Sequence, residues 1–239
     1  MKPDVSVFLL AYNEEENIRE AVESSISVLE DVAGEWEVVV VLYEGSTDNT
    51  RAVVEELAGK DRRVRLVIQK KDNAGYGAAM RVGYDSSHYP LIFYTDADNQ
   101  FDVNELRGFL PLTGEADLVV GYRADRKDPP GRLLAAKVYN ILIWLVFGLR
   151  VRDVDCAFKL VKREVFGKFR LDCKTGLADA ELLVKAKKFG FRIVEVPVSH
   201  RPRKAGKAVF HAGGLGFVKP KIVLNLLKDM VKLKKELRV

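Results

Sequence analysis

The sequence predicts an α/β fold with a mostly parallel, twisted sheet and helices on both faces. Segments typical of strands alternate with segments typical of helices over the first 120 or so residues. One of the strand segments, Trp36–Leu42, is apolar at almost every position, as strands buried on both faces are. With 239 residues, 48% of them hydrophobic, the chain is long enough to bury one large core.

The strands are recognised as short apolar runs bounded by polar or turn-forming residues. Most are rich in valine, isoleucine or aromatic side chains, which fit a pleated surface. Taken in order, strands are expected at Val5–Ala11, Trp36–Leu42, Val64–Gln69, Leu91–Thr95, Asp117–Gly121 and Phe191–Val198.

The helices between these strands begin at residues that commonly cap helices. Asn13, followed by three glutamates, and Asp48 can each accept hydrogen bonds from the first turn of a helix. A charged loop with two prolines, from Asp125 to Gly131, separates the alternating region from the rest of the chain. Helices are expected from Asn13 to about Val32, Asp48 to about Ala58, Asn73 to about Ser86, Asp102 to Leu110, Leu133 to Leu149 and Gly176 to Phe189.

The C-terminal segment, Gly213–Val239, is predicted to be a basic amphipathic helix that follows a main domain of residues 1–212. Its apolar residues are spaced by threes and fours, which places them on one stripe with lysines around it. A helix of this kind is expected to lie on a membrane surface, and packing into an ordinary core is the alternative. The stripe comprises Leu215, Val218, Ile222, Leu226, Met230, Leu233 and Leu237.

The composition indicates the charge of a binding partner and the cellular compartment, but it does not identify a function. The net charge of +5 indicates an anionic partner such as a nucleotide, a lipid surface or a nucleic acid. Two cysteines, Cys156 and Cys173, are expected to be free thiols in a reducing, cytoplasmic compartment. Because no stretch approaches about 20 apolar residues, no membrane span is expected, and acidic residues around Val5–Ala11 disfavour a signal peptide.

Asp96 and Asp98 follow directly on the apolar run that ends at Thr95. Carboxylates this close repel each other unless a cation lies between them, and Mg2+ or Mn2+ prefers oxygen ligands. Gln100 offers a further oxygen. At the carboxyl end of a strand in an α/β sheet, such a metal would bridge a diphosphate. The alternative is that both aspartates only form a turn and cap the next helix.

Three further polar stretches are expected at the same edge of the sheet: Leu10–Glu15, Tyr43–Asp48 and Asn73–Ala79. Together with Thr95–Gln100, they resemble the P-x-Y-N-E, D-D-G-S-x-D, N-x-G-x-x-x-A and D-A-D-x-Q motifs of inverting family-two glycosyltransferases, which have the nucleotide-sugar-binding GT-A fold. The resemblance covers about residues 4–123. It implies that a nucleotide sugar contacts Ala11, Tyr12, Asn13, Glu15, Tyr43, Glu44, Asn73, Gly75, Asp96 and Ala97.

Later residues resemble the polyprenyl-phosphate (dolichol-phosphate) sugar synthase branch of that family. Gly121–Arg123 resembles its G-x-R motif, Asp155–Lys159 a degenerate D-x-x-x-G-F-[RK], and Arg203–Lys207 part of R-x-x-G-x-S. The resemblance implies a polyprenyl phosphate acceptor, a peripheral position on the membrane and no nucleic-acid partner. It assigns the catalytic roles to Asp98, Arg123, Arg132, Arg203 and Glu181.

The sequence departs from these motifs at three places. Tyr43-Glu44 stands where the family has two aspartates, Ala11 replaces a proline, and Ala208 replaces the last serine. Since the first of those aspartates usually contacts the nucleotide, Tyr43 is expected to stack on the base instead. The departures leave the identity of the donor open.

The expected chemistry is sugar transfer with inversion. The metal would stabilise the departing diphosphate, and a phosphate acceptor, whose second pKa is about 6, needs no strong base. The first alternative is transfer to a soluble sugar or protein hydroxyl, with Asp179 or Glu181 as the base. The second is a non-catalytic, membrane-peripheral binding protein of the same fold. A nucleotidyltransferase is disfavoured, because Leu10–Glu14 replaces the glycine-rich loop expected there.

Overall fold

The structure, a computed structural model, describes residues 1–126, 128, 130–203 and 220–237. It contains a seven-stranded sheet in the order β3-β2-β1-β4-β6-β5-β7. β6 runs antiparallel to both of its neighbours, β4 and β5, and every other pair of neighbouring strands is parallel. The strands are β1 (Val5–Ala11), β2 (Trp36–Tyr43), β3 (Val64–Gln69), β4 (Leu91–Asp96), β5 (Leu118–Arg123), β6 (Phe158–Lys162) and β7 (Ile193–Val198).

Helices connect most of the strands. The segment expected to be one helix from Asp102 to Leu110 is instead a short α-helical turn between two 3-10 segments. The α-helices are α1 (Ile18–Val32), α2 (Thr50–Lys60), α3 (Tyr76–Ser86), α4 (Leu106–Phe109), α5 (Pro130–Phe147), α6 (Ala178–Lys188) and α8 (Pro220–Leu237), and the 3-10 segments are η1 (Lys71–Asn73), η2 (Val103–Glu105), η3 (Leu110–Gly114) and η4 (Arg163–Gly167).

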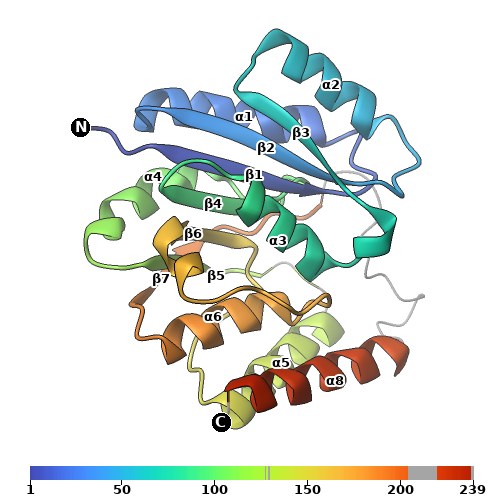
Figure 1. Ribbon diagram of the computed structural model, residues 1–239, viewed down its shortest axis with the longest axis vertical. Coiled ribbons are helices and arrows are strands. Elements are labelled where there is room, and N and C mark those ends of the chain that lie inside the picture. Colours follow the sequence, from blue (N-terminus) through green and yellow to red (C-terminus); the bar gives the residue numbers. More distant parts are fainter. Residues whose placement is uncertain (127, 129, 204–219, 238–239) are drawn as a thin grey trace.

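The sheet separates two hydrophobic cores, because alternate side chains of each strand point to opposite faces. Val7 and Leu9 of β1 pack with α1, α2 and α4 on one face, whereas Phe8 and Leu10 pack with α3 and α6 on the other. Figure 1 shows α1 and α3 on either side of the strands. The expected α/β architecture is therefore confirmed, with β6 as an element that the sequence did not reveal.

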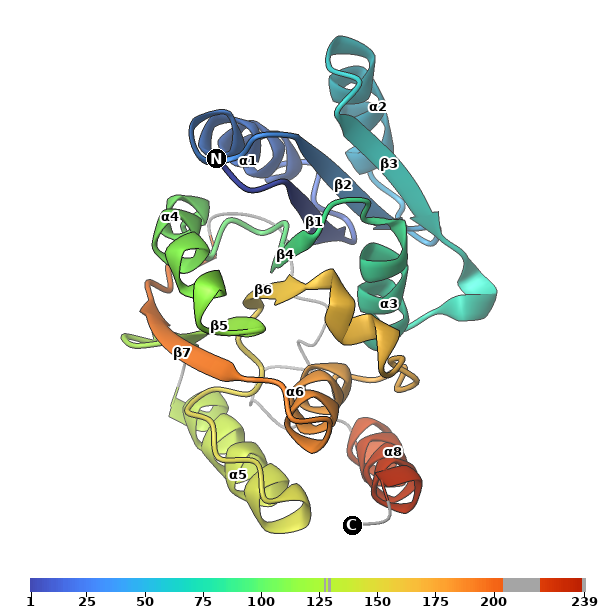
Figure 2. The ribbon, with the colours of Figure 1, turned by 60° about the vertical axis from the view of Figure 1, so that its left-hand side comes forward.

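α5 and α8 lie beyond α6, at the end of the molecule farthest from α2 and β3 (Figures 1 and 2). In the described part of α8, Met230, Leu233 and Leu237 are buried in the core shared with α6, and Leu226 packs against it. The apolar stripe predicted to meet a membrane therefore faces the protein. Of the other stripe residues, Leu215 and Val218 and the side chain of Ile222 lie outside the described residues.

One helix of the described chain, α5, is long and apolar enough to cross a membrane, with a mean hydropathy of 1.3. Only 11% of that window is buried inside the protein. The expectation that no segment has these properties was therefore wrong, because Arg132 and Lys137 are too few charges to lower the average.

Candidate active site

The predicted polar residues meet where the order of the strands reverses. β1 lies between β2 and β4, so the loops after β1 and β4 leave the same edge of the sheet side by side. Two asparagines in these loops, Asn13 and Asn99, adopt left-handed backbone conformations, with φ of 54° and 57°. Asparagine tolerates this conformation better than most residues, and it turns both loops sharply over the edge. Such a reversal point is where α/β sheets form their ligand crevices.

Three carboxylates gather at this edge: Glu14 after β1, and Asp96 and Asp98 at the end of β4. Burial raises the pKa of Asp96 well above its usual value, and the negative charges of Asp98, Asp179 and Glu14 raise it further. Burial also raises the pKa values of Asp98 and Glu14. The site therefore favours a bound proton or a cation over three unbalanced carboxylates.

Arg203 supplies the cation that this site holds in the structure. Its Nη1 lies 3.1 Å from Oδ2 of Asp98, and its Nη2 donates to Oε1 of Glu14. Oxygen ligands whose charges require a counter-cation fit a hard divalent ion such as Mg2+ or Mn2+. The donor set of Asp96 and Asp98 thus suits the predicted metal, which would compete with Arg203 for Asp98.

Gln100, the third predicted metal ligand, is tied to the segment that carries Arg203. Its side-chain Nε2 donates to the carbonyl of Arg201 over 3.1 Å, and its own carbonyl accepts from the Arg201 amide at 2.7 Å. The Gln100 amide in turn donates to Oδ1 of Asp98 over 3.1 Å. Gln100 therefore links the loop that carries Asp98 to the Arg201–Arg203 segment.

The loops after β1 and β2 are joined by side-chain hydrogen bonds. The Asn13 Oδ1 accepts from the Thr47 amide at 2.8 Å, and Glu15 accepts from the Asn49 amide at 2.8 Å. Asp48 accepts from the Glu15 amide at 3.0 Å. Asn13 and Glu15, both predicted to contact the donor, thus hold the two loops in a fixed relation.

Two aromatic rings lie beside these loops. The ring centroids of Tyr12 and Tyr43 are 5.7 Å apart, and the rings are tilted by 54°. Glu44, next to Tyr43, turns to the loop after β3, where it accepts from Lys70 Nζ at 3.2 Å and from the Lys71 amide at 3.0 Å. The Tyr43-Glu44 pair therefore offers a ring, and not a carboxylate, beside the loop that carries Tyr12.

Asn73 and Gly75 lie in the turn that leads into α3. Gly75 has φ of 117°, and a Cβ built there would lie 2.3 Å from the Lys174 carbonyl, so no other residue fits without a shift. The Gly77 amide donates to that same carbonyl over 3.2 Å. Asn73 accepts from Arg81 at 3.0 Å. Asn73 and Gly75 thus shape the turn, and part of the N-terminus of α3 is already satisfied by protein.

The predicted phosphate-binding arginines each have an internal carboxylate partner. Arg123 forms a two-point ion pair with Asp153, at 2.6 and 2.7 Å, and both side chains are almost fully buried. Arg132 lies 3.1 Å from Asp128, but half of its side chain is exposed. Its positive charge partly offsets the rise in the pKa of Asp98 that burial causes. Arg132 and Arg203 are therefore placed at the carboxylate cluster, whereas Arg123 is held by Asp153.

A buried ionic network lies next to Asp96. Lys159 of β6 is fully buried and donates to Asp179 over 2.5 Å, and the hydroxyl of Tyr94 donates to the same carboxylate. Asp155, at the start of the same segment, is exposed to solvent, yet the surrounding protein and the charge of Asp179 raise its pKa to about 7. Sequence reasoning assigned no role to Asp155, although it lies in a motif already singled out.

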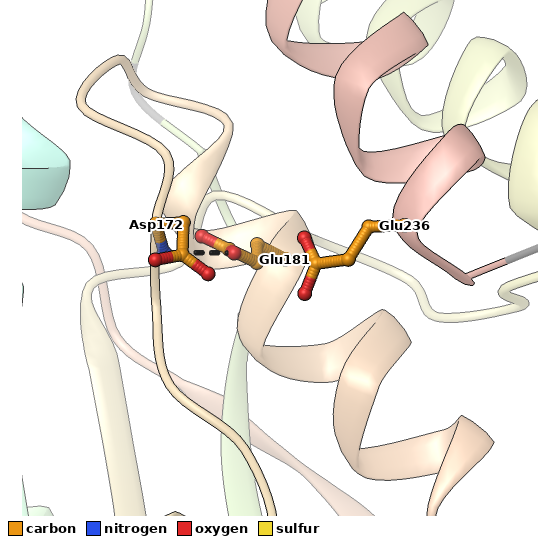
Figure 3. A group of neighbouring side chains, drawn as sticks. All are labelled: Asp172, Glu181 and Glu236. Carbon is orange, nitrogen blue, oxygen red and sulfur yellow. Dashed lines mark hydrogen bonds between the residues drawn. The ribbon is translucent and has the colours of Figure 1, made fainter.

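Glu181 belongs to a separate cluster, shown in Figure 3. Its carboxylate accepts from the amides of Asp172 and Cys173, each at 2.9 Å. Asp172, Glu181 and Glu236 are close enough together to hold a metal ion. However, Lys185 Nζ lies 2.8 Å from Glu181 and 2.7 Å from Glu236, and it fills the cluster. The predicted catalytic role of Glu181 has no support in this geometry, whereas Asp179, two residues earlier, lies beside Asp96.

Comparison with known proteins gives a family for most of the chain. Residues 6–170 match the family described as Glycosyl transferase family 2. The chain is 32% identical to the glycosyltransferase AglD of Haloferax volcanii over 212 residues, which cover 84% of this chain and 33% of AglD. It is 28% identical to undecaprenyl-phosphate 4-deoxy-4-formamido-L-arabinose transferase of Proteus mirabilis, covering 95% of this chain and 66% of that protein. The chain thus spans two thirds or less of these relatives.

Two other comparisons agree with these. Dolichyl-phosphate beta-glucosyltransferase ALG5C of Trichomonas vaginalis is 32% identical over 208 residues, which cover 79% of this chain and 61% of that protein. Glucosyl-3-phosphoglycerate synthase of Mycobacterium tuberculosis, solved with UDP, superposes with a TM-score of 0.68 at 22% identity and covers 96% of this chain and 80% of the solved chain. The same enzyme has been solved with Mn2+ and UDP-glucose. The superposition confirms the expected GT-A fold.

Proposed function

The chain belongs to glycosyl transferase family 2, and on that premise we propose that it transfers a sugar, with inversion, from a nucleoside-diphosphate sugar to a polyprenyl phosphate. The observation that carries the transfer is the carboxylate cluster of Glu14, Asp96 and Asp98 at the reversal point of the sheet. The acceptor is supported by relatives named for undecaprenyl phosphate and dolichyl phosphate.

Asp96 and Asp98 would hold Mg2+ or Mn2+. When bound, the metal supplies Lewis-acid stabilisation of the diphosphate that departs from the sugar. By holding the metal at the end of β4, the same two carboxylates would also orient the diphosphate. Tyr12 and Tyr43 flank the place where the base would lie, since aromatic rings stack on any base. The donor site is therefore built from the loops after β1, β2 and β4.

Arg132 and Arg203 would position the phosphate of the acceptor. A guanidinium offers two parallel N–H donors to a phosphate, so it orients the nucleophilic oxygen as well as attracting the charge. Arg203 would exchange its contact with Asp98 for the phosphate once a divalent cation balances the carboxylates. Arg123 would support Arg132 and Arg203 only indirectly, because its own guanidinium is held in the ion pair with Asp153.

The decisive experiment measures transfer from UDP-, GDP- and CDP-sugars to a short-chain polyprenyl phosphate with Mn2+. Asp98→Asn is expected to reduce transfer by at least 100-fold while leaving the fold intact, because the diphosphate loses its metal and the free carboxylates repel less. Asp102→Asn, which alters a more exposed carboxylate of the same loop, serves as the control. Wild-type turnover by Asp98→Asn at saturating Mn2+ would refute the metal-binding role.

A second function, transfer to a soluble hydroxyl acceptor, is favoured by one finding. The stripe of α8 expected to dock on a membrane is buried against α6. A hydroxyl acceptor requires a base, and Asp155, with a pKa of about 7 and access to solvent, meets that need better than Asp179, which Lys159 and Tyr94 occupy. Glycosylation of glycerol or a simple sugar, but not of polyprenyl phosphate, would favour this alternative.

A further inference from the structure

α5 carries two apolar faces. Its inner face contributes Ile143 and Phe147 to the core beneath α6, and both side chains are buried. Its outer face exposes four residues with spacing of four, three and four, which places them on a single stripe. This outer stripe consists of Leu134, Val138, Ile141 and Leu145, whose side chains are between 45% and 67% exposed.

A hollow of about 430 Å3 borders this stripe. It lies between α5, the segment after it and β7, and its walls combine apolar surface with basic groups. Its principal lining residues are Lys137, Ile141 and Trp144 from α5, Arg150 and Arg152 from the following segment, and Glu195 from β7.

The charges of the hollow are unbalanced. Among the residues that the structure describes, the side chains of Lys137, Arg150 and Arg152 form no ion pair. The guanidinium groups instead lie over aromatic rings, Arg150 at 5.4 Å from the Trp144 ring and Arg152 at 4.5 Å from the Tyr122 ring. Glu195 is engaged by the Arg152 backbone amide at 2.6 Å. The hollow therefore presents three positively charged side chains beside the exposed ring of Trp144, and it suits an anionic ligand.

We propose that the hollow binds the phosphate headgroup of an anionic phospholipid while the outer stripe of α5 lies among the adjoining acyl chains. A helix with one apolar face and basic residues beside it settles in the interface, and tryptophan favours that depth. The proposal deepens the proposed function, since a lipid-anchored acceptor requires the domain at a bilayer surface.

Two observations favour a helix that lies on the bilayer over one that spans it. Ile143 and Phe147 are anchored in the core, and a spanning helix would have to withdraw both from it. The neighbouring α8 also exposes apolar residues on its outer side, Leu224, Leu227 and Val231. Figures 1 and 2 show α5 and α8 at the same end of the molecule, and in Figure 2 they lie on either side of α6. α8 therefore adds exposed apolar surface at the end of the molecule where α5 lies.

The test is co-sedimentation with vesicles of phosphatidylcholine containing phosphatidylglycerol, compared with vesicles of phosphatidylcholine alone. Arg150→Gln/Arg152→Gln is expected to lower the partition coefficient on the anionic vesicles by about 30-fold, the contribution of two basic residues near such a surface. The matched control is Arg62→Gln/Arg170→Gln, which removes two exposed arginines elsewhere. Equal binding by both variants, or equal binding to both kinds of vesicle, would overturn the proposal.

Fluorescence locates the contact independently. The chain has two tryptophans, of which Trp36 is buried and Trp144 is exposed. Brominated lipids should quench the emission of the wild type but not that of Trp144→Phe, and Leu134→Gln/Leu145→Gln should weaken binding. Absence of quenching in the wild type, or resistance of the bound protein to alkaline extraction, as expected of a spanning helix, would overturn the proposal.

Activity separates this proposal from the proposed function. Transfer to a short-chain, water-soluble polyprenyl phosphate requires no bilayer, so the Arg150→Gln/Arg152→Gln variant should retain it at the wild-type rate. If vesicles bind the wild type as expected but no sugar is transferred, the proposed function fails and the docking surface stands. If sugar is transferred but the wild type does not bind vesicles, the proposed function stands and the docking surface on α5 is refuted.

Discussion

At the scale of single residues, the balance of charge around Asp98 is set by an arginine distant in the sequence. Arg203 contacts both Asp98 and Glu14 and so neutralises part of a site with excess negative charge. The sequence motif that begins at Arg203 predicted a contact with the acceptor phosphate. A motif shows the residue type, but not the partner that the side chain has in the ligand-free protein. In the structure Arg203 pairs with Asp98, so it would compete with the proposed divalent cation for that ligand.

Arg203→Gln is therefore expected to tighten binding of Mn2+ several-fold when no nucleotide is present, because the competing cation is gone. The measurement is Mn2+ binding followed by electron paramagnetic resonance. Arg201→Gln, which removes a cation that instead pairs with Asp102, provides the matched control. Weaker or unchanged Mn2+ binding by Arg203→Gln would contradict the competition.

His200 makes stability depend on pH. Burial, together with the charge of Arg123, lowers its pKa from 6.5 to about 4. The unfolded chain therefore binds more protons than the folded chain between these values, and stability falls as pH decreases from 6.5 towards 4. At pH 5 the loss attributable to His200 is about 2 kcal/mol.

The measurement is urea denaturation of the wild type and of His200→Gln at pH 7 and pH 5. Glutamine does not titrate between pH 7 and pH 5. The free energy of unfolding of the variant should therefore decrease by about 2 kcal/mol less than that of the wild type over this pH range. An identical pH dependence in the two proteins would show that His200 is accessible to protons in the folded state.

At the scale of elements, periodicity predicted most helices and strands, because their patterns are local. β6 was missed because Lys159 interrupts its short apolar run, and only the fold supplies Asp179, which makes a buried lysine tolerable. The apolar stripe of α8 was recognised correctly, but spacing alone cannot show whether such a stripe faces solvent, membrane or protein. The pairing of Arg123 with Asp153 was equally invisible, since the two residues are thirty positions apart.

The orientation of α8 can be tested with a matched pair of leucines. Leu233 is 1% exposed and Leu227 is 42% exposed. Leu233→Ala is expected to lower the free energy of unfolding by about 2–4 kcal/mol, because it leaves a cavity against α6, whereas Leu227→Ala should change it by less than about 0.5 kcal/mol. Denaturant titrations of both variants provide the comparison. Similar losses would indicate that α8 does not pack as described.

At the scale of the whole molecule, the site is complete only when distant parts of the chain are assembled. Asp96 and Asp98, the proposed metal ligands, come from the end of β4 and the loop after it, their counter-cation Arg203 from the segment after β7, and the neighbouring Asp179 from α6. The parts resembling the donor site were recognisable because their motifs are continuous. The acceptor side depends on ion pairs across the fold, which a single sequence does not reveal.

β6 joins two halves of the sheet that have no other strand pairing with each other. β4 and β5 both pair with β6 and not with one another. On the ribosome, β1 to β4 can pair early, but β4 ends at Asp96 and β6, which covers its edge, begins only at Phe158, 62 positions later. At roughly 5–20 residues per second, the open edge of β4 persists for about 3–12 s. During this interval the nascent chain presents an unpaired, apolar strand edge, the kind of surface that chaperones shield.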